Sequence, residues 1–106
     1  NKIMGIFSWL FGGSAKQDLT GIINDGAYLV DVRSPREFSQ NHVKGSVNIP
    51  LDSIPSQLAK FKNRKHIIVF CRSGNRSSQA KSFLEQNGFA NVVNGGTVEI
   101  VNQFVS

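Results

Sequence analysis

This chain of 106 residues contains few of the residues that support disulfide or metal chemistry. It has one cysteine, Cys71, and two histidines, His42 and His66, far apart in the sequence. A lone cysteine cannot form an internal disulfide, and these three residues give no zinc-binding pattern. We therefore expect no bound metal. The lack of an internal disulfide fits a reducing compartment, and the absence of a convincing export signal predicts a cytoplasmic location. Any reaction that starts at Cys71 must be completed by a nucleophile from outside the chain.

The sequence also lacks a long apolar run, so we expect no transmembrane segment. The apolar stretch at residues 5–13 is too short to cross a bilayer. It lacks the features of an export signal, and Trp9 occupies the position where a myristoylation signal needs serine or threonine. We interpret residues 1–14 as an apolar segment and linker, which includes tag residues if residues 1–3 precede a natural start at Met4. Either membrane or partner contact, or packing of Trp9 and Phe11 on the domain, fits this segment.

The chain is basic, with a formal net charge of +5. Part of the charge is concentrated at residues 60–65, where Phe61 is the only aromatic residue. Proteins that bind single-stranded nucleic acid usually combine such charge with several stacking aromatic residues. We favour a solvated loop and expect no nucleic-acid partner. The positive charge would help to attract small anions.

Apolar strand-like runs alternate with helical patterns from residue 15 to residue 106, which we take as one domain. Strands are expected at residues 27–32, 45–50, 66–70 and 91–93, with a turn at Gly95 and Gly96. Helices are expected at 15–24, 35–41, from Asp52 or Ser53 to about 61, at 75–87 and from 98 onward. This order predicts an α/β fold with a central parallel sheet of about five short strands and helices on both faces.

Ser34 and Glu37 have the spacing of a capping box at the start of the second expected helix, with Pro35 at its first position.

Cys71 stands between a buried strand and a helix, where parallel α/β folds bind their ligands. The segment that follows, here called the Cys71 loop, contains Cys71, Arg72, Ser73, Gly74, Asn75, Arg76 and Ser77. Backbone N–H groups at a helix start favour a bound anion, and two arginines add positive charge. The pKa of the thiol is therefore expected to lie well below the ordinary value of about 8.5. The alternative is a buried cysteine that only packs in the core.

Four segments resemble the motifs of rhodanese domains, in the order in which that family has them. These segments are residues 29–33 with Glu37 and Phe38, residues 41–50, the Cys71 loop, and residues 94–96 with Glu99. The resemblance extends over most of the chain, from residue 16 to residue 106. Asn41 stands where the family usually has glycine, which predicts a strained turn. Val98 stands where many members have tryptophan, which affects packing.

The resemblance implies a rhodanese-like fold and a thiosulfate sulfurtransferase activity that uses no cofactor. Cys71 would attack the sulfane sulfur of a small anionic donor such as thiosulfate and carry it as a persulfide. The N–H groups of residues 72–76 would surround that persulfide, and Arg72 and Arg76 would bind the donor. Gly74 would let the loop curl, and Ser73 and Ser77 would donate hydrogen bonds, although Ser77 is equally suited to cap the helix.

The family resemblance also suggests the partners of the reaction. The sulfur acceptor would be cyanide or an external thiol, with a protein persulfide as an alternative donor and thioredoxin as a candidate protein partner. Asp31 and Arg33 are supporting residues at a neighbouring strand end, and we favour a buried ion pair or a loop brace over direct catalysis. For His42 we favour a bracing hydrogen bond over acid–base chemistry.

Two other functions stay open at this stage. Phosphatases and arsenate reductases of similar architecture have five residues between their cysteine and arginine. The present chain has four between Cys71 and Arg76, and a tighter loop suits a single sulfur atom better. A non-catalytic rhodanese-like module for binding or redox sensing is the second alternative. The cysteine itself argues against that module, whereas the apolar N-terminal segment favours it.

Overall fold

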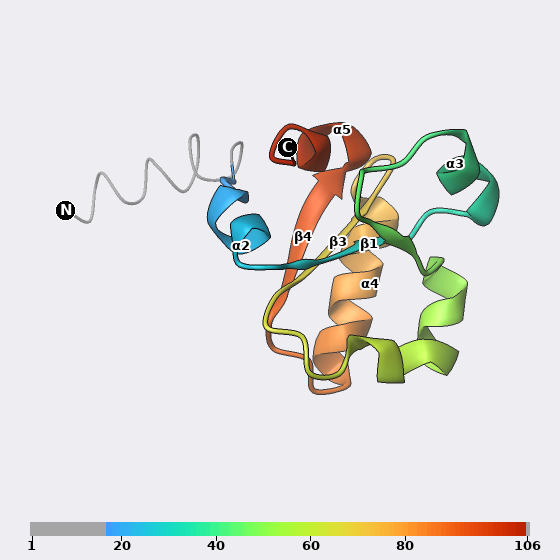
Figure 1. The fold of residues 1–106 in the computed structure, drawn as a ribbon. Coiled ribbons are helices and arrows are strands. Elements are labelled where there is room, and N and C mark those ends of the chain that lie inside the picture. Colours follow the sequence, from blue (N-terminus) through green and yellow to red (C-terminus); the bar gives the residue numbers. More distant parts are fainter. Residues whose placement is uncertain (1–16, 106) are drawn as a thin grey trace, which may run out of the picture.

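The computed structural model describes residues 17–105, so the segment expected at residues 1–14 lies outside the described range. The core is a parallel sheet with the strand order β2-β1-β3-β4 (Figure 1). Its strands are β1 (Tyr28–Asp31), β2 (Val47–Asn48), β3 (Ile67–Cys71) and β4 (Val92–Thr97). The α/β class is confirmed, and the sheet has four strands in residues 17–105 where about five were expected.

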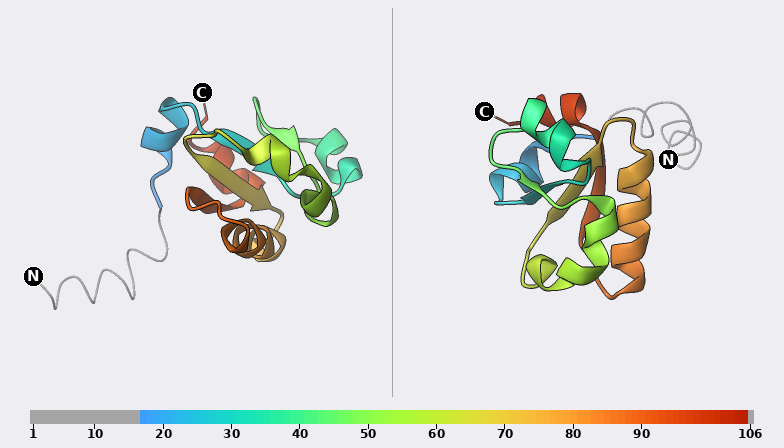
Figure 2. Two further views of the ribbon diagram at one scale, coloured as in Figure 1. Left: turned by 90° about the horizontal axis from the view of Figure 1, so that it is seen from below. Right: turned by 90° about the vertical axis from the view of Figure 1, so that its right-hand side faces the viewer.

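Helices cover both faces of the sheet (Figure 2). They are α2 (Thr20–Asn24), α3 (Pro35–Gln40), the 3-10 helix η2 (Leu51–Phe61), α4 (Asn75–Gln86) and α5 (Val98–Asn102). The helices α4 and η2 pack on one face, and α2 and α5 pack on the other. In the described part of the chain, no helix is long and apolar enough to cross a membrane.

The central strand β3 is buried along its whole length, which explains why its sequence is a continuous apolar run. Side chains of a strand alternate between the two faces of the sheet. Accordingly, Ile68 and Phe70 pack in the core beside α5, whereas Ile67, Val69 and Cys71 pack in the core beside α4. This alternation places the sulfur of Cys71 on the α4 side of the sheet.

The predicted capping box at α3 is confirmed. Ser34 Oγ accepts a hydrogen bond from the Glu37 backbone N–H at 3.2 Å, and Glu37 Oε1 accepts one from the Ser34 backbone N–H at 3.0 Å. The helix expected to start at Asp52 or Ser53 begins earlier, at Leu51, with Pro50 at the N-cap position, so neither Asp52 nor Ser53 caps it. The strain expected at Asn41 is also absent, since this residue is extended, with φ −164° and ψ 150°.

Strand β4 continues beyond the expected end at residue 93, through the two glycines and on to Thr97. A bulge makes this possible: Val69 pairs with Asn94 and Phe70 pairs with Gly96, so Gly95 has no partner on β3. A Cβ atom on Gly95 would lie 2.7 Å from Val101 Cγ2 and 2.8 Å from Ile68 Cγ2, which leaves no space for a side chain. The expected turn is therefore a bulged strand packed under α5.

Candidate active site at Cys71

The structure places the sulfur of Cys71 at the N-terminus of α4. The Gly74 backbone N–H donates to Sγ at 3.0 Å and the Ser77 backbone N–H donates at 3.4 Å. Gly74 is the N-cap residue, has φ 96°, and carries no side chain that could cap the helix. An N-cap side chain usually accepts from the third helical N–H, which here belongs to Ser77. Cys71 Sγ therefore takes the place of the capping oxygen.

These contacts set the acidity of the thiol. Burial alone would raise the pKa of Cys71, because an anion is poorly solvated in the protein interior. Hydrogen bonds from the Ser77 hydroxyl and from the N–H groups of Ser77, Ser73 and Gly74 outweigh burial, so the pKa lies below its ordinary value. The prediction that amides of the Cys71 loop face the sulfur is confirmed for Gly74, and Ser77 adds an N–H one residue beyond the predicted range.

Ser77 connects the sulfur to the end of the sheet. Its side chain is fully buried, with Oγ 3.4 Å from Cys71 Sγ and 2.7 Å from Asn94 Oδ1. The sequence assigned no role to Asn94. The available signal was strand alternation: Val92 packs on the α4 side of the sheet and Val93 on the α5 side, so Asn94 points to the α4 side, where Cys71 lies.

The two arginines of the loop have different surroundings. Arg76 donates to both carboxylate oxygens of Glu37, at 2.7 and 3.0 Å, whereas Arg72 is exposed. Hydrogen bonding to Arg76, and then to the Ser34 backbone, lowers the pKa of Glu37 to about 2. The guanidinium of Arg76, which was expected to bind a donor, is therefore bound to the carboxylate of Glu37. From the sequence, Glu37 was assigned only to a helix cap.

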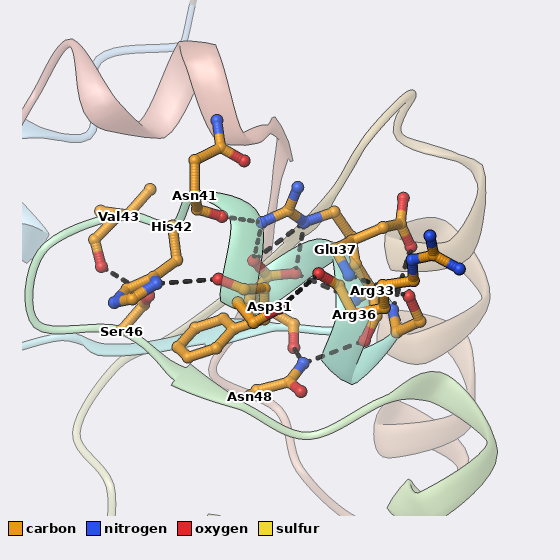
Figure 3. Close-up of polar contacts among 12 residues, drawn as sticks. Asp31, Arg33, Arg36, Glu37, Asn41, His42, Val43, Ser46 and Asn48 are labelled. Carbon is orange, nitrogen blue, oxygen red and sulfur yellow. Dashed lines mark hydrogen bonds and ion pairs between the residues drawn. The ribbon is translucent and has the colours of Figure 1, made fainter.

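The supporting residues form a closed ion pair. Arg33 Nη2 lies 2.7 Å from Asp31 Oδ2, both side chains are buried, and the same Arg33 nitrogen donates to the Asn41 carbonyl at 2.7 Å (Figure 3). Asn48 Nδ2 donates to the carbonyls of Asp31 and Arg33 at 3.0 and 2.9 Å. The favoured interpretation, a buried ion pair or a loop brace, agrees with these contacts.

His42 lies at the end of α3. Its Nδ1 is 2.9 Å from the Phe38 carbonyl, and its ring stacks on that of Phe38 at 4.0 Å between centroids. These contacts agree with the favoured bracing role. In the Cys71 loop, Ser73 and Asn75 are exposed.

A pocket of about 210 Å³ lies beside Arg76. Its other lining residues come from the loops that follow β1 and β2, and they are Val32, Ser34, Pro35, Pro50, Leu51 and Asp52. The lining is mainly apolar, with the carboxylate of Asp52 and the guanidinium of Arg76, which is already bound to Glu37. The position fits the expectation that ligands bind at the C-terminal ends of the strands.

The family model of the rhodanese-like domain matches residues 15–103 of the chain. The chain belongs to the rhodanese-like domain family. Thiosulfate sulfurtransferase PspE of Escherichia coli is 38% identical over 69 residues, which cover 63% of this chain and 66% of PspE. Thiosulfate sulfurtransferase GlpE of Pseudomonas savastanoi is 41% identical over 73 residues, which cover 67% of this chain and 69% of GlpE. This rhodanese domain thus matches about two thirds of the length of these relatives.

The fold agrees with solved rhodanese structures. A structure titled "rhodanese with anions from E. coli" superposes with a TM-score of 0.64 at 34% sequence identity, over 71% of this chain and 91% of that chain. In the present rhodanese domain, sequence reasoning located the cysteine and its helix. It missed the partners of Arg76 and Ser77, which are Glu37 and Asn94.

Proposed function

We propose that this rhodanese domain is a sulfurtransferase that carries sulfane sulfur as a persulfide on Cys71. The observation that carries the proposal is the pair of backbone N–H groups, from Gly74 and Ser77, directed at Cys71 Sγ at 3.0 and 3.4 Å. Such fixed donors stabilise a thiolate and, after sulfur uptake, the negative charge of a persulfide. The names of the relatives PspE and GlpE support the same reaction, with thiosulfate as the donor.

In the first step, the Cys71 thiolate attacks the outer sulfur of thiosulfate. A bond forms between Sγ and that sulfur, and the original sulfur–sulfur bond breaks with its electron pair leaving on sulfite. The product is a Cys71 persulfide anion, so negative charge stays at the helix N-terminus throughout. A prearranged N–H donor at such a site contributes roughly 3 kcal/mol to stabilising the transition state.

In the second step, a nucleophile removes the outer sulfur. Cyanide attacks it to form thiocyanate, or an external thiolate attacks it to form a new persulfide. In either case the bond to Sγ breaks and its electron pair returns to Cys71 as the thiolate. This rhodanese domain needs an external acceptor because it has no second cysteine.

Access to the sulfur constrains both steps. Cys71 has no exposed surface, whereas Arg72 and Ser73 lie exposed in the loop. Donor and acceptor therefore require the side chains around the Cys71 loop to move apart. The pocket beside Arg76 is suited to hold the non-reacting part of an acceptor, because its lining is mainly apolar and it adjoins the loop.

The arrangement of Arg76 argues against the phosphatase alternative. A phosphatase arginine must grip an oxyanion, but Arg76 Nη1 and Nη2 both donate to Glu37. We therefore expect no hydrolysis of an aryl phosphate by this protein.

The decisive experiment is mass spectrometry after incubation with thiosulfate. We expect the intact chain to gain the mass of one sulfur atom and to lose it on treatment with cyanide or dithiothreitol. Cys71→Ser should gain nothing, whereas Ser78→Ala, an exposed change on α4, should behave like the wild type. A wild-type protein that gains no sulfur, or a gain that persists in Cys71→Ser, would contradict the proposal.

A further inference from the structure

Asn94 has a defined orientation next to the Cys71 loop. Its Oδ1 accepts a hydrogen bond from the Gly96 backbone N–H at 2.9 Å, and its Nδ2 lies 3.5 Å from the Gly74 carbonyl. An N–H group can only donate, so Gly96 fixes which end of the amide is oxygen. The acceptor oxygen of Asn94 consequently faces Ser77 Oγ, at 2.7 Å.

The Ser77 hydroxyl has one proton and several acceptors around it. Asn94 Oδ1 is at 2.7 Å, the Gly74 carbonyl at 3.1 Å and Cys71 Sγ at 3.4 Å. The distances favour donation to Asn94. In that arrangement Ser77 Oγ offers its lone pairs to the sulfur, where they accept from a thiol S–H and repel a thiolate. The hydroxyl stabilises a thiolate only after its proton turns from Asn94 to Sγ.

We propose that Asn94 is a positioning residue that moderates the acidity of Cys71 by competing for the Ser77 proton. The role rests on the proposed use of Cys71 as the sulfur nucleophile. Three observations carry it: the short Ser77–Asn94 contact, the Gly96 N–H that orients the amide, and the pairing of Asn94 with Val69, which places its side chain on the α4 side of the sheet with Cys71.

The chemistry of sulfur transfer explains why such moderation is useful. The intrinsic nucleophilicity of a thiolate falls as its pKa falls, and the best attacking thiol has a pKa near the working pH. The N–H groups of Gly74 and Ser77 lower the pKa of Cys71 whatever the state of the hydroxyl. A competing acceptor at Asn94 limits the further decrease that the Ser77 hydroxyl can cause.

The proposed effect of Asn94 on the acidity of Cys71 does not come from a charged side chain bound to Asn94. The charged residues of β1, α3, α4, α5 and the loops after β1 and β3 are Asp31, Arg33, Arg36, Glu37, Arg72, Arg76, Lys81, Glu85 and Glu99. In residues 17–105, none of them is a hydrogen-bond partner of Asn94. The Gly74 carbonyl already accepts from the Ser78 N–H at 3.0 Å, so the charged sulfur is the stronger alternative once Asn94 is removed.

The test follows thiolate ultraviolet absorbance against pH, with Cys71→Ser as the blank for tyrosine ionisation. Asn94→Ala should lower the midpoint by about half to one pH unit, the value of one ordinary hydrogen bond. Asn94→Asp strengthens the competing acceptor and adds negative charge, so it should raise the midpoint. Asn91→Ala is the matched control, because Asn91 braces the carbonyls of Arg64 and Lys65 at the opposite end of β4. It should leave the midpoint unchanged.

The Ser77→Ala background shows whether the hydroxyl transmits the effect. There, Asn94→Ala should no longer shift the midpoint, and the shift of Asn94→Asp should shrink. A purely structural brace would instead loosen the loop, so that Asn94→Ala raised the midpoint. That rise, or equal shifts with and without the Ser77 hydroxyl, would overturn the inference. If Asn94→Ala does not fold, the Asn94→Asp comparison decides alone.

These titrations need no sulfur donor, so they fail independently of the proposed function. If the midpoints behave as expected but thiosulfate adds no sulfur, the hydroxyl competition stands and the assigned reaction is wrong. If sulfur is transferred but the midpoint rises in Asn94→Ala, the reaction stands and Asn94 only braces the loop.

Discussion

Replacing Glu37 by glutamine tests whether the Glu37–Arg76 pair fixes the Cys71 loop against α3. The pair joins α3 to α4 through residues that are 39 positions apart in sequence, with two hydrogen bonds at 2.7 and 3.0 Å. Glutamine keeps an acceptor for the capping box with Ser34 but removes the charge. Glu37→Gln therefore isolates the ionic contribution from the local cap.

The magnitude follows from the lowered pKa of Glu37, which is about 2 in the folded protein against an ordinary value of 4.5. A difference of this size corresponds to at most about 3 kcal/mol of stability. The Glu37 side chain is 25% exposed and that of Arg76 is 36% exposed, so solvent screens the pair. We expect Glu37→Gln to reduce the free energy of unfolding by about 1 to 2 kcal/mol at neutral pH.

The pH dependence has a definite sign. A carboxylate with a lowered folded-state pKa stabilises the fold fully above its unfolded-state pKa, and this contribution is lost as pH falls through the folded-state value. The difference between wild type and Glu37→Gln should therefore be constant above about pH 5, shrink as pH falls toward 2, and vanish below it.

Urea unfolding followed by circular dichroism across this pH range measures the difference. Glu85→Gln is the control, because Glu85 and Lys81 form an exposed pair on one face of α4. Glu85→Gln should reduce the free energy of unfolding by no more than about 0.5 kcal/mol. A pH-independent cost for Glu37→Gln, or one no larger than that of the control, would refute the claim that this pair holds the loop.

Two further substitutions test the packing under the site. Gly95→Ala places a Cβ 2.7 Å from Val101 Cγ2, so it should destabilise by about 1 to 3 kcal/mol in urea unfolding, whereas Gly21→Ala, with no atom within 4 Å of its Cβ, should be neutral or stabilising. Equal effects would mean that β4 shifts freely under α5. Asp31→Asn leaves buried Arg33 without its counter-charge and should cost about 3 to 5 kcal/mol in the same assay. A cost similar to that of Asp25→Asn, which breaks a half-exposed pair with Lys65, would show that solvent reaches Arg33.

Features governed by local spacing could be predicted from the sequence. The capping box of Ser34 and Glu37 depends on residues three apart, and the buried strand before Cys71 follows from its continuous apolar run. The glycine at position 74 has φ 96°, a conformation that glycine adopts without strain. These local rules were sufficient to place the thiol at a helix N-terminus.

Contacts between distant segments could not be predicted in this way. Arg76 and Glu37 meet because α3 and α4 follow neighbouring strands, and no local pattern states which carboxylate will face which guanidinium. Asn94 lies on the same side of the sheet as Cys71 because β4 continues past Val93 and side-chain direction in a strand reverses with each residue. Reading Gly95 and Gly96 as a turn ended the expected strand at residue 93 and left Asn94 outside it.

Together, the distant contacts change the physical account of the site. Arg33 and Arg76, two of the arginines that the sequence assigns to the site, are each bound to a carboxylate. Neither is therefore a free cation beside Cys71. Stabilisation of the anion then depends mainly on the neutral N–H groups of Gly74 and Ser77. These dipoles are fixed by the backbone of α4 and need no rearrangement as charge develops.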